Sequence, residues 1–117
     1  MNDVIDVIKL SACISAQDGV ISNRELDKCR ELVRDAYGDL SDESFDQAID
    51  DFFDENLDLE DYLEKVKSHE IDNHIVLKIS YESAISDGFD IRENLAFTKA
   101  CKFFDISEER FIDAWTC

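Results

Sequence analysis

The sequence predicts an all-α protein, a single-domain bundle of about seven helices with an internal pseudo-twofold duplication. Three observations favour this fold class. The chain has no proline and only three glycines, so it contains few helix breakers. Hydrophobic residues make up 44% of its 117 residues, which suits one buried core. A helix–turn–helix pattern also occurs twice, with Val7–Ser11 aligned to Val76–Ser80 and Asp18-Gly19 aligned to Asp87-Gly88.

The first half-repeat, about residues 3–37, predicts two helices. Apolar residues cover much of the circumference between Val4 and Gln17, so the first helix should be mostly buried. Ser22-x-x-Glu25 predicts a capping box at the start of the second helix, and Gly38 supplies the left-handed residue that ends it. The apolar positions of this second helix follow the helical spacing: Leu26, Cys29, Val33, Ala36 and Tyr37.

Two acidic helices, within about residues 41–67, join the half-repeats. Each begins with a hydrophobic staple, in which Leu40-Ser41 pairs with Phe45 and Leu57-Asp58 pairs with Tyr62. The first of these helices should carry its apolar residues on one face: Phe45, Ala48, Ile49, Phe52 and Phe53.

The second half-repeat, about residues 70–104, should repeat the first. A helix from about Glu70 to Ser86 precedes the second turn, and Asp90-x-x-Glu93 is the capping box of the helix that follows this turn. A short last helix should run from Glu108 to about Trp115. The helix between them carries apolar residues at Leu95, Phe97, Ala100, Cys101 and Phe104. Residues 1–117 therefore form one domain, without a linker or a low-complexity tail.

The formal net charge is −17, from 29 acids and 12 bases. Thirteen of the acids lie between Asp35 and Glu64, a stretch without any lysine or arginine. Such a field repels nucleic acid and anionic membranes, and it attracts cations or a basic protein surface. We therefore expect a protein partner, no nucleic acid and no membrane insertion.

The chain shows no pattern of a membrane span or a signal peptide, so we expect a cytoplasmic protein. Its four cysteines are widely spaced and include no C-x-x-C pair, which favours core thiols in a reducing compartment over disulfides or a zinc site. They are Cys13, Cys29, Cys101 and Cys117. No catalytic constellation is present, and His69 and His74 are too far apart in sequence to form a ligand pair one helical turn apart. An enzyme is therefore not expected.

The segment Asp18–Glu25 matches the second half of a calcium-binding EF-hand loop, with a Gly after the Asp and a Glu six residues after the Gly. The first half is missing, because Ile14 and Ala16 occupy the earlier ligand positions and have no side-chain oxygen. In the second copy, Asn94 stands where the bidentate Glu would be. The chain is therefore not an EF-hand protein.

Two longer segments resemble the TerB family of bacterial tellurite-resistance proteins and the wider TerB-like domain. They are Ser15-Ala16-Gln17-Asp18-Gly19-Val20-Ile21-Ser22-x-x-Glu25 and Ala84-Ile85-Ser86-Asp87-Gly88-Phe89-Asp90-x-x-Glu93. Gln17 and Ser86 replace the alanine usual in the family, and the second cap comes one residue early. The resemblance covers nearly the whole chain and implies an all-helical fold with this duplication.

The resemblance also implies a divalent-cation site, Ca²⁺ or Mg²⁺, at the turns. The residues carried over are Asp18, Glu25, Asp87 and Glu93, with Asp90 and Asn94 as weaker candidates. The structural alternative is that the aspartates shape the turns and the glutamates complete capping boxes, and taken alone each turn favours this alternative. No other cofactor is implied.

Two functions remain open at this stage. A TerB-like adaptor or accessory protein of a stress response would use the turns. An acidic inhibitor, immunity or DNA-mimic protein would instead bind a basic partner through the acidic helices at about residues 41–67.

Overall fold

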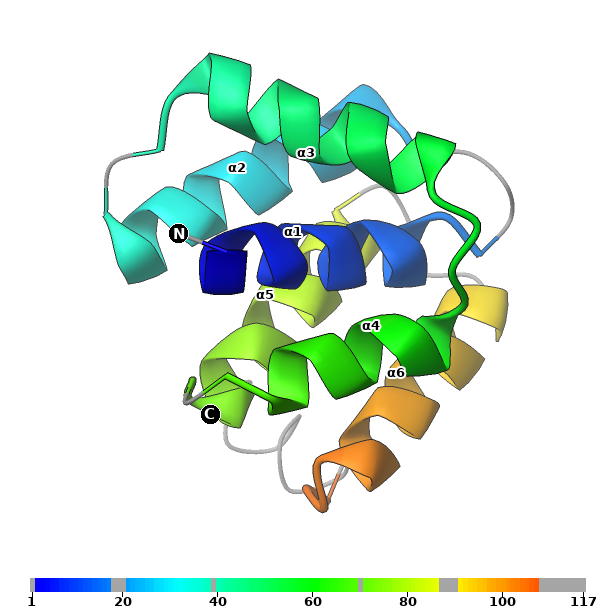
Figure 1. The fold of residues 1–117 in the computed structure, drawn as a ribbon. Coiled ribbons are helices and arrows are strands. Elements are labelled where there is room, and N and C mark those ends of the chain that lie inside the picture. The colour runs from blue at the N-terminus through cyan, green and yellow to red at the C-terminus, as the bar shows by residue number, and fades with distance from the viewer. Residues whose placement is uncertain (1, 18–20, 39, 70, 87–90, 108–117) are drawn as a thin grey trace.

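Six α-helices and no strands make up the described part of the computed structural model, which covers residues 2–17, 21–38, 40–69, 71–86 and 91–107 (Figure 1). The helices are α1 (Asn2–Ser15), α2 (Asn23–Tyr37), α3 (Asp42–Asp54), α4 (Leu59–Lys67), α5 (Asn73–Ile85) and α6 (Ile91–Phe103). The predicted all-α class is confirmed. The predicted seventh helix, from Glu108, lies outside the described residues, and the internal duplication with its half-repeat boundaries stays a prediction.

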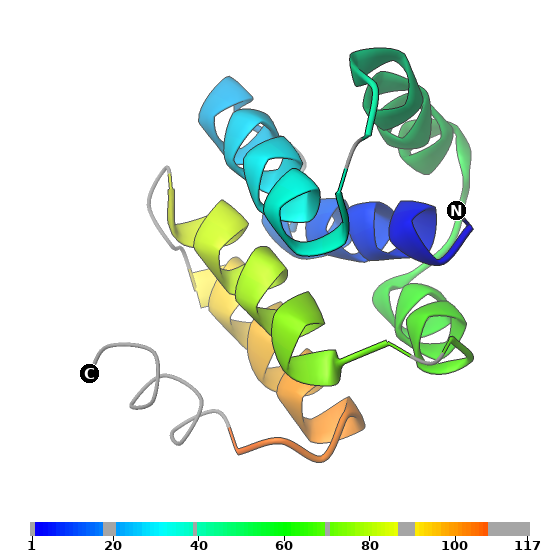
Figure 2. The same cartoon turned by 90° about the vertical axis from the view of Figure 1, so that its left-hand side faces the viewer.

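Helix α1 lies at the centre of the bundle and contacts each of the other five helices (Figures 1 and 2). Buried residues lie on all sides of this helix, as its apolar composition predicts. They are Val7, Ile8, Leu10, Ser11, Ala12, Cys13, Ile14 and Ser15. Helix α5 is the other mainly buried helix and packs on both α1 and α2. The core is therefore built around these two helices, and the Cα radius of gyration of 12.8 Å is that of one compact domain.

The helix starts follow the predicted caps. Ser22, Ser41 and Asp58 are the N-caps of α2, α3 and α4, and each side chain accepts a backbone N–H three residues later. Gly38 follows α2 with φ of 92°, a left-handed conformation that favours glycine. Helix α5 differs from the prediction, since it starts at Asn73 behind an Asp72 N-cap and not near residue 70.

Two apolar residues that the periodicity placed with the core side chains are exposed. Phe53 on α3 is 56% exposed and Leu95 on α6 is 63% exposed. Helix α6 buries Glu93 and Phe97, and Leu95 lies about 200° around the helix from each of them, at 100° per residue. Its side chain therefore points away from the core.

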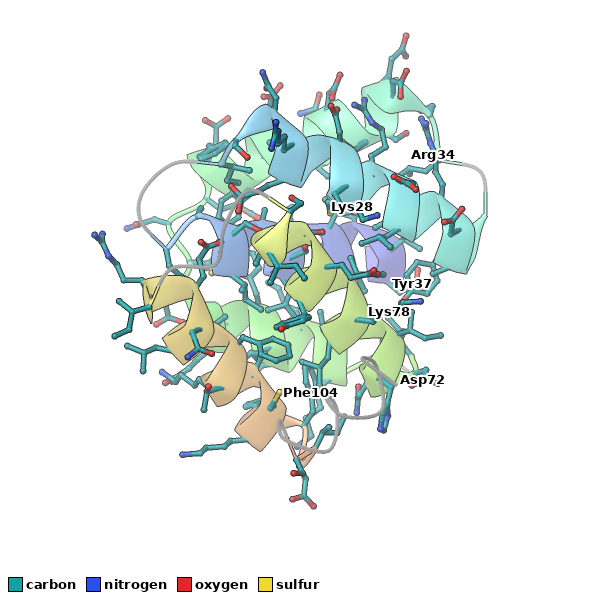
Figure 3. The ribbon with its side chains drawn as sticks, turned by 180° about the vertical axis from the view of Figure 1, so that it is seen from behind. Lys28, Arg34, Tyr37, Asp72, Lys78 and Phe104 are labelled. Carbon is teal, nitrogen blue, oxygen red and sulfur yellow. The ribbon has the colours of Figure 1, made fainter. Side chains whose placement is uncertain are left out.

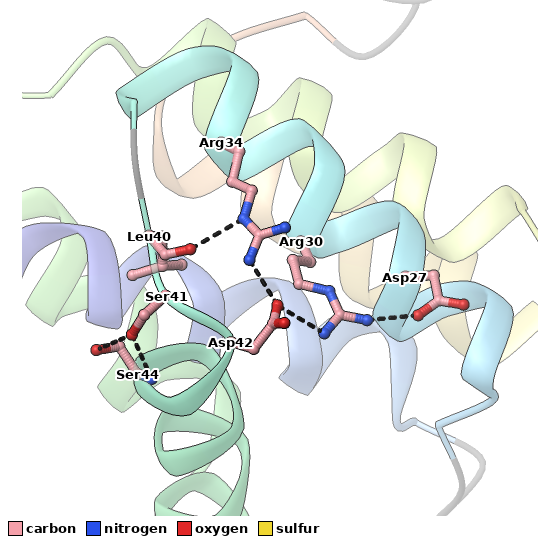
Figure 4. Close-up of polar contacts among 7 residues, drawn as sticks. All are labelled: Asp27, Arg30, Arg34, Leu40, Ser41, Asp42 and Ser44. Carbon is pink, nitrogen blue, oxygen red and sulfur yellow. Dashed lines mark hydrogen bonds and ion pairs between the residues drawn. The ribbon is translucent and has the colours of Figure 1, made fainter.

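The segment between α2 and α3 is held by two arginines (Figure 4). Arg34 donates from Nε to the carbonyl oxygen of Leu40 at 2.9 Å, and both Arg34 and Arg30 pair with the carboxylate of Asp42. The hydrogen bond from Arg34 is the main reason that the pKa of Asp42 is lowered. Arg30 also pairs with Asp27 at 2.7 Å. These contacts compensate the negative charge of Asp42, one of the first acids in the stretch from Asp35 to Glu64.

Lysine 9 of α1 reaches the acidic stretch from the core side. Its Nζ lies 2.7 and 3.0 Å from the two carboxylate oxygens of Glu55, directly after α3. The ion pair ties the central helix to the α3–α4 connection.

Lysines of α2 and α5, Lys28 and Lys78, lie on the face of the bundle seen in Figure 3. Glu82 of α5 is half-buried, and this burial raises its pKa, while the charges of Lys78 and Lys28 act in the opposite direction. Its Oε2 is buried without a hydrogen-bond partner. In the described part of the chain, no helix is long and apolar enough to cross a membrane.

Candidate functional site

Of the four residues proposed from the sequence as cation ligands, the structure describes Glu25 and Glu93. Asp18 and Asp87 lie outside the described residues, as does the weaker candidate Asp90, and Asn94 is exposed on α6. The structure therefore tests the surroundings of the two glutamates and not the complete ligand set.

Glu25 is the third residue of α2 and completes the predicted capping box. The Ser22 hydroxyl accepts the Glu25 N–H at 3.1 Å, and the Ser22 N–H donates to Glu25 Oε1 at 3.0 Å. The extended backbone of Ser22 brings the two groups together. The Glu25 side chain is only 6% exposed. The capping interpretation of this residue is thus confirmed, whether or not a cation also binds there.

Glu93 holds the matching place in the second half, as the third residue of α6. It is 4% exposed, and no charged residue other than Glu25 and Glu93 is buried in the described part of the chain. Burial of a carboxylate costs several kcal/mol unless hydrogen bonds or an opposite charge compensate it. The two glutamates singled out by the sequence are therefore also the two that burial distinguishes from the other described acids.

A group of buried hydroxyls lies in the core formed by α1, α2 and α5. Ser11, Ser15 and Ser83 are 0 to 3% exposed, and none of the three hydroxyls makes a hydrogen bond of ordinary geometry. Burial raises the pKa of the Cys29 thiol to about 11, and the nearby hydroxyls of Ser11 and Ser83 act in the opposite direction. The sequence analysis missed these serines. Their signal was present, because Ser11 and Ser15 are one helical turn apart on a helix that is otherwise apolar.

An open pocket of about 510 Å³ is lined by residues that flank both Asp-Gly motifs in the sequence. The end of α1 contributes Cys13 and Gln17, and Gln17 immediately precedes the first turn. Helix α6 contributes Arg92, near its start, and Lys99. The start of α4 forms the opposite wall with Asp58 and Glu60, and Glu60 pairs with Lys99 at 2.7 Å. Segments remote in sequence thus bring the borders of the two Asp-Gly turns to one pocket.

Other candidate ligands are not gathered in the structure. Among the residues that it describes, no three His, Cys, Asp or Glu side chains are close enough together to hold a metal ion. His69 Nε2 lies 2.8 Å from Asp6 Oδ2 and so links the segment after α4 to α1, while His74 is exposed near Asp72. A cation site of three or more such side chains would therefore include residues outside the described ranges.

The fold and the motifs define a class: a small all-helical domain in which each of two Asp-Gly motifs is followed in the sequence by a buried glutamate. The family model described as tellurite resistance protein TerB matches residues 4–115. The chain belongs to the TerB family, as the turn motifs suggested. No curated protein and no solved structure matches the chain significantly.

Proposed function

We propose that this chain is a non-enzymatic accessory protein of a tellurite-resistance-type stress response, acting as a cytoplasmic adaptor with a weak divalent-cation site at its Asp-Gly turns. Membership of the TerB family supports the class of response. The observation that carries the cation site is the burial of Glu25 and Glu93, at 6% and 4% exposure, in a chain of net charge −17. A cation bound near these two glutamates would reduce the repulsion among the acids of so negatively charged a chain.

Oxygen ligands from carboxylates are those that Ca²⁺ and Mg²⁺ prefer. Asp18 precedes Glu25 by seven residues and Asp87 precedes Glu93 by six, so each turn supplies one aspartate and one glutamate. The capping box uses Oε1 of Glu25. It would remain if a cation neutralised the charge of this carboxylate. Structural capping and cation binding are therefore compatible in the same residue.

The test compares Asp18→Asn and Glu25→Gln with wild type. Both changes remove a charge, and Gln preserves the capping box that Glu25 makes. If Ca²⁺ or Mg²⁺ binds, a concentration about ten times the Kd stabilises wild type by about 1.4 kcal/mol, and each variant loses most of that gain. Thermal unfolding with each chloride salt measures the gain.

Diffuse screening by a divalent ion could imitate binding on so acidic a surface. Asp50→Asn, on the exposed face of α3, is the matched control because it removes one charge far along the chain from either turn. A gain reduced equally in the control and in the turn variants would exclude the specific site.

A second function is favoured by the outer face of α3. Glu43, Asp46, Asp50 and Asp54 are all exposed on this helix, which lies on the outside of the bundle (Figure 1). Such a face would suit an acidic inhibitor that binds a basic partner. An inhibitor of this kind should bind its partner equally well after Asp18→Asn, should lose affinity steeply with salt, and should weaken on Asp50→Lys. The accessory protein should show the reverse sensitivities.

A further inference from the structure

Helix α6 lies at one side of the bundle, where it packs on α1, α4 and α5 (Figures 1 and 2). It is also the last of the described helices in the chain, while α1, the first, lies at the centre. Each of the helices α2 to α5 has a described helix before it and after it. Helix α6 can therefore leave its place while the chain from α1 to α5 keeps its packing.

Few large side chains hold α6 in the core. Phe97 is the one large side chain of this helix that is fully buried, and its other buried apolar residues are the small Ala96, Ala100 and Cys101. The helices that α6 contacts bury three or four large side chains each: Val7, Ile8, Leu10 and Ile14 on α1, Tyr62, Leu63 and Val66 on α4, and Val76, Leu77 and Ile79 on α5. Each fully buried side chain of this size favours the folded state about tenfold or more. Helix α6 is thus held by less apolar burial than its neighbours.

A comparison with α2 identifies apolar contacts that α6 does not make. The two helices can be aligned on their buried glutamates, since each is the third residue of its helix. Leu26 of α2 then matches Asn94 of α6, which is exposed, and Leu32 matches the smaller Ala100. Both leucines pack partly buried against the core. The nearest leucine of α6, Leu95, is 63% exposed and so does little to hold the helix.

Two links between α6 and α4 lie at the surface. Lys99 pairs with Glu60 of α4 at 2.7 Å, and the two side chains are 55% and 60% exposed. Near the other end of α6, Nζ of the exposed Lys67 lies 5.1 Å from the centroid of the Phe103 ring. Ion pairs and cation–π contacts contribute little when water surrounds them. These links position α6 without holding it firmly.

We infer that α6 opens as a unit, so that the folded protein includes a minor state in which α1 to α5 stay packed and α6 is detached. Opening breaks the ring contact of Phe97 with Tyr81 of α5, 5.0 Å between centroids, and exposes Cys101. It also moves the buried Glu93 relative to Glu25 of α2. A ligand that binds both α6 and the remaining helices would shift the protein toward the closed state. The inference does not depend on a bound cation.

Thiol labelling of the full native chain compares Cys101 on α6 with Cys29 on α2, which are 1% and 4% exposed. The reaction runs in EDTA with several concentrations of a thiol reagent, and peptide mass spectrometry follows each cysteine. Where the rate is proportional to reagent, its ratio to the rate in unfolded protein gives the population of the state that exposes the thiol. Cys101 should label at least about tenfold faster than Cys29. Low concentrations of urea should raise the Cys101 rate less steeply, because opening of α6 exposes less surface than unfolding does.

Two lysine-to-methionine variants separate opening from global unfolding. Lys9→Met breaks the ion pair with Glu55, which stays formed when only α6 opens. This variant should raise the Cys29 rate about five- to thirtyfold and the Cys101 rate by a smaller factor. Lys99→Met breaks the ion pair between α6 and α4, which is lost in opening and in unfolding alike. It should raise both rates by the same factor.

Three results would overturn the inference. One is labelling of the two thiols at rates within about threefold of each other, or faster labelling of Cys29, since both would then report the same or the opposite order of opening. Another is an equal increase of both rates in Lys9→Met. The third is an equal dependence of both rates on urea in wild type, which decides the question even if circular dichroism shows that Lys9→Met does not fold.

Discussion

Replacing Lys9 with Met should lower the free energy of unfolding by about 1 to 2 kcal/mol, because it breaks the ion pair between α1 and the α3–α4 connection. The pair is neither fully exposed nor fully buried, with side chains 13% and 26% exposed. Exposed pairs contribute up to about 1 kcal/mol, and removal of one partner from a buried pair costs about 3 to 5 kcal/mol. The partial exposure places this pair between the exposed and the buried case. Both Glu55 oxygens also accept a hydrogen bond from Nζ.

A double-mutant cycle isolates the interaction. Lys9→Met keeps most of the apolar stem, and Glu55→Gln keeps a hydrogen-bond acceptor of similar shape. Urea unfolding of the wild type, the two single variants and the double variant should give a coupling energy of about 1 kcal/mol. Because the pair is mostly shielded from solvent, about 0.5 M NaCl should reduce this coupling by less than half. A coupling below about 0.3 kcal/mol would refute the assignment of stability to this pair.

Three further predictions follow from burial and charge. Sodium chloride should raise the melting temperature by screening the acidic stretch, as should Asp54→Lys on the exposed part of α3; an unchanged or lower value would contradict this. Cys13, Cys29 and Cys101 are buried, and burial raises the pKa of the first two to about 11, so native protein should label slowly at these thiols with a thiol reagent at about pH 8. Burial raises the pKa of Glu82, so the folded state holds its proton more tightly than the unfolded state, and stability is lost as pH rises through that raised value. Glu82→Gln should therefore melt higher than wild type at about pH 7 and show little difference near pH 4, as measured by calorimetry.

Local signals predicted most of the fold. Ser22, Ser41 and Asp58 cap their helices as the staples and capping boxes indicated, because a helix start is decided by a few neighbouring side chains. Periodicity also identified α1 as mostly buried. The prediction from periodicity was wrong at Leu95. This residue lies two positions from the buried Glu93 and Phe97, so its side chain faces away from them on the helix.

The surroundings of the candidate site were much harder to read from the sequence. The motif identified Glu25 and Glu93, yet their burial depends on how α2 and α6 pack, which no local pattern contains. The pocket joins Gln17, Glu60 and Arg92, which are tens of residues apart in the chain. Such contacts arise from the tertiary arrangement alone. The sequence therefore indicated the turns without the pocket that borders them.

The central position of α1 also bears on how the protein is made. Helix α1 is synthesised before every other described helix, yet its packing on α5, which begins some seventy residues later in the chain, forms only after α5 has been added. At about 5 to 20 residues per second, its apolar surface stays uncovered for several seconds on the ribosome. Contacts so distant in sequence should also make this bundle fold more slowly than helical proteins whose neighbours in sequence are neighbours in space. We therefore expect the chain to be most prone to aggregation while the apolar residues of α1 lack their later partners.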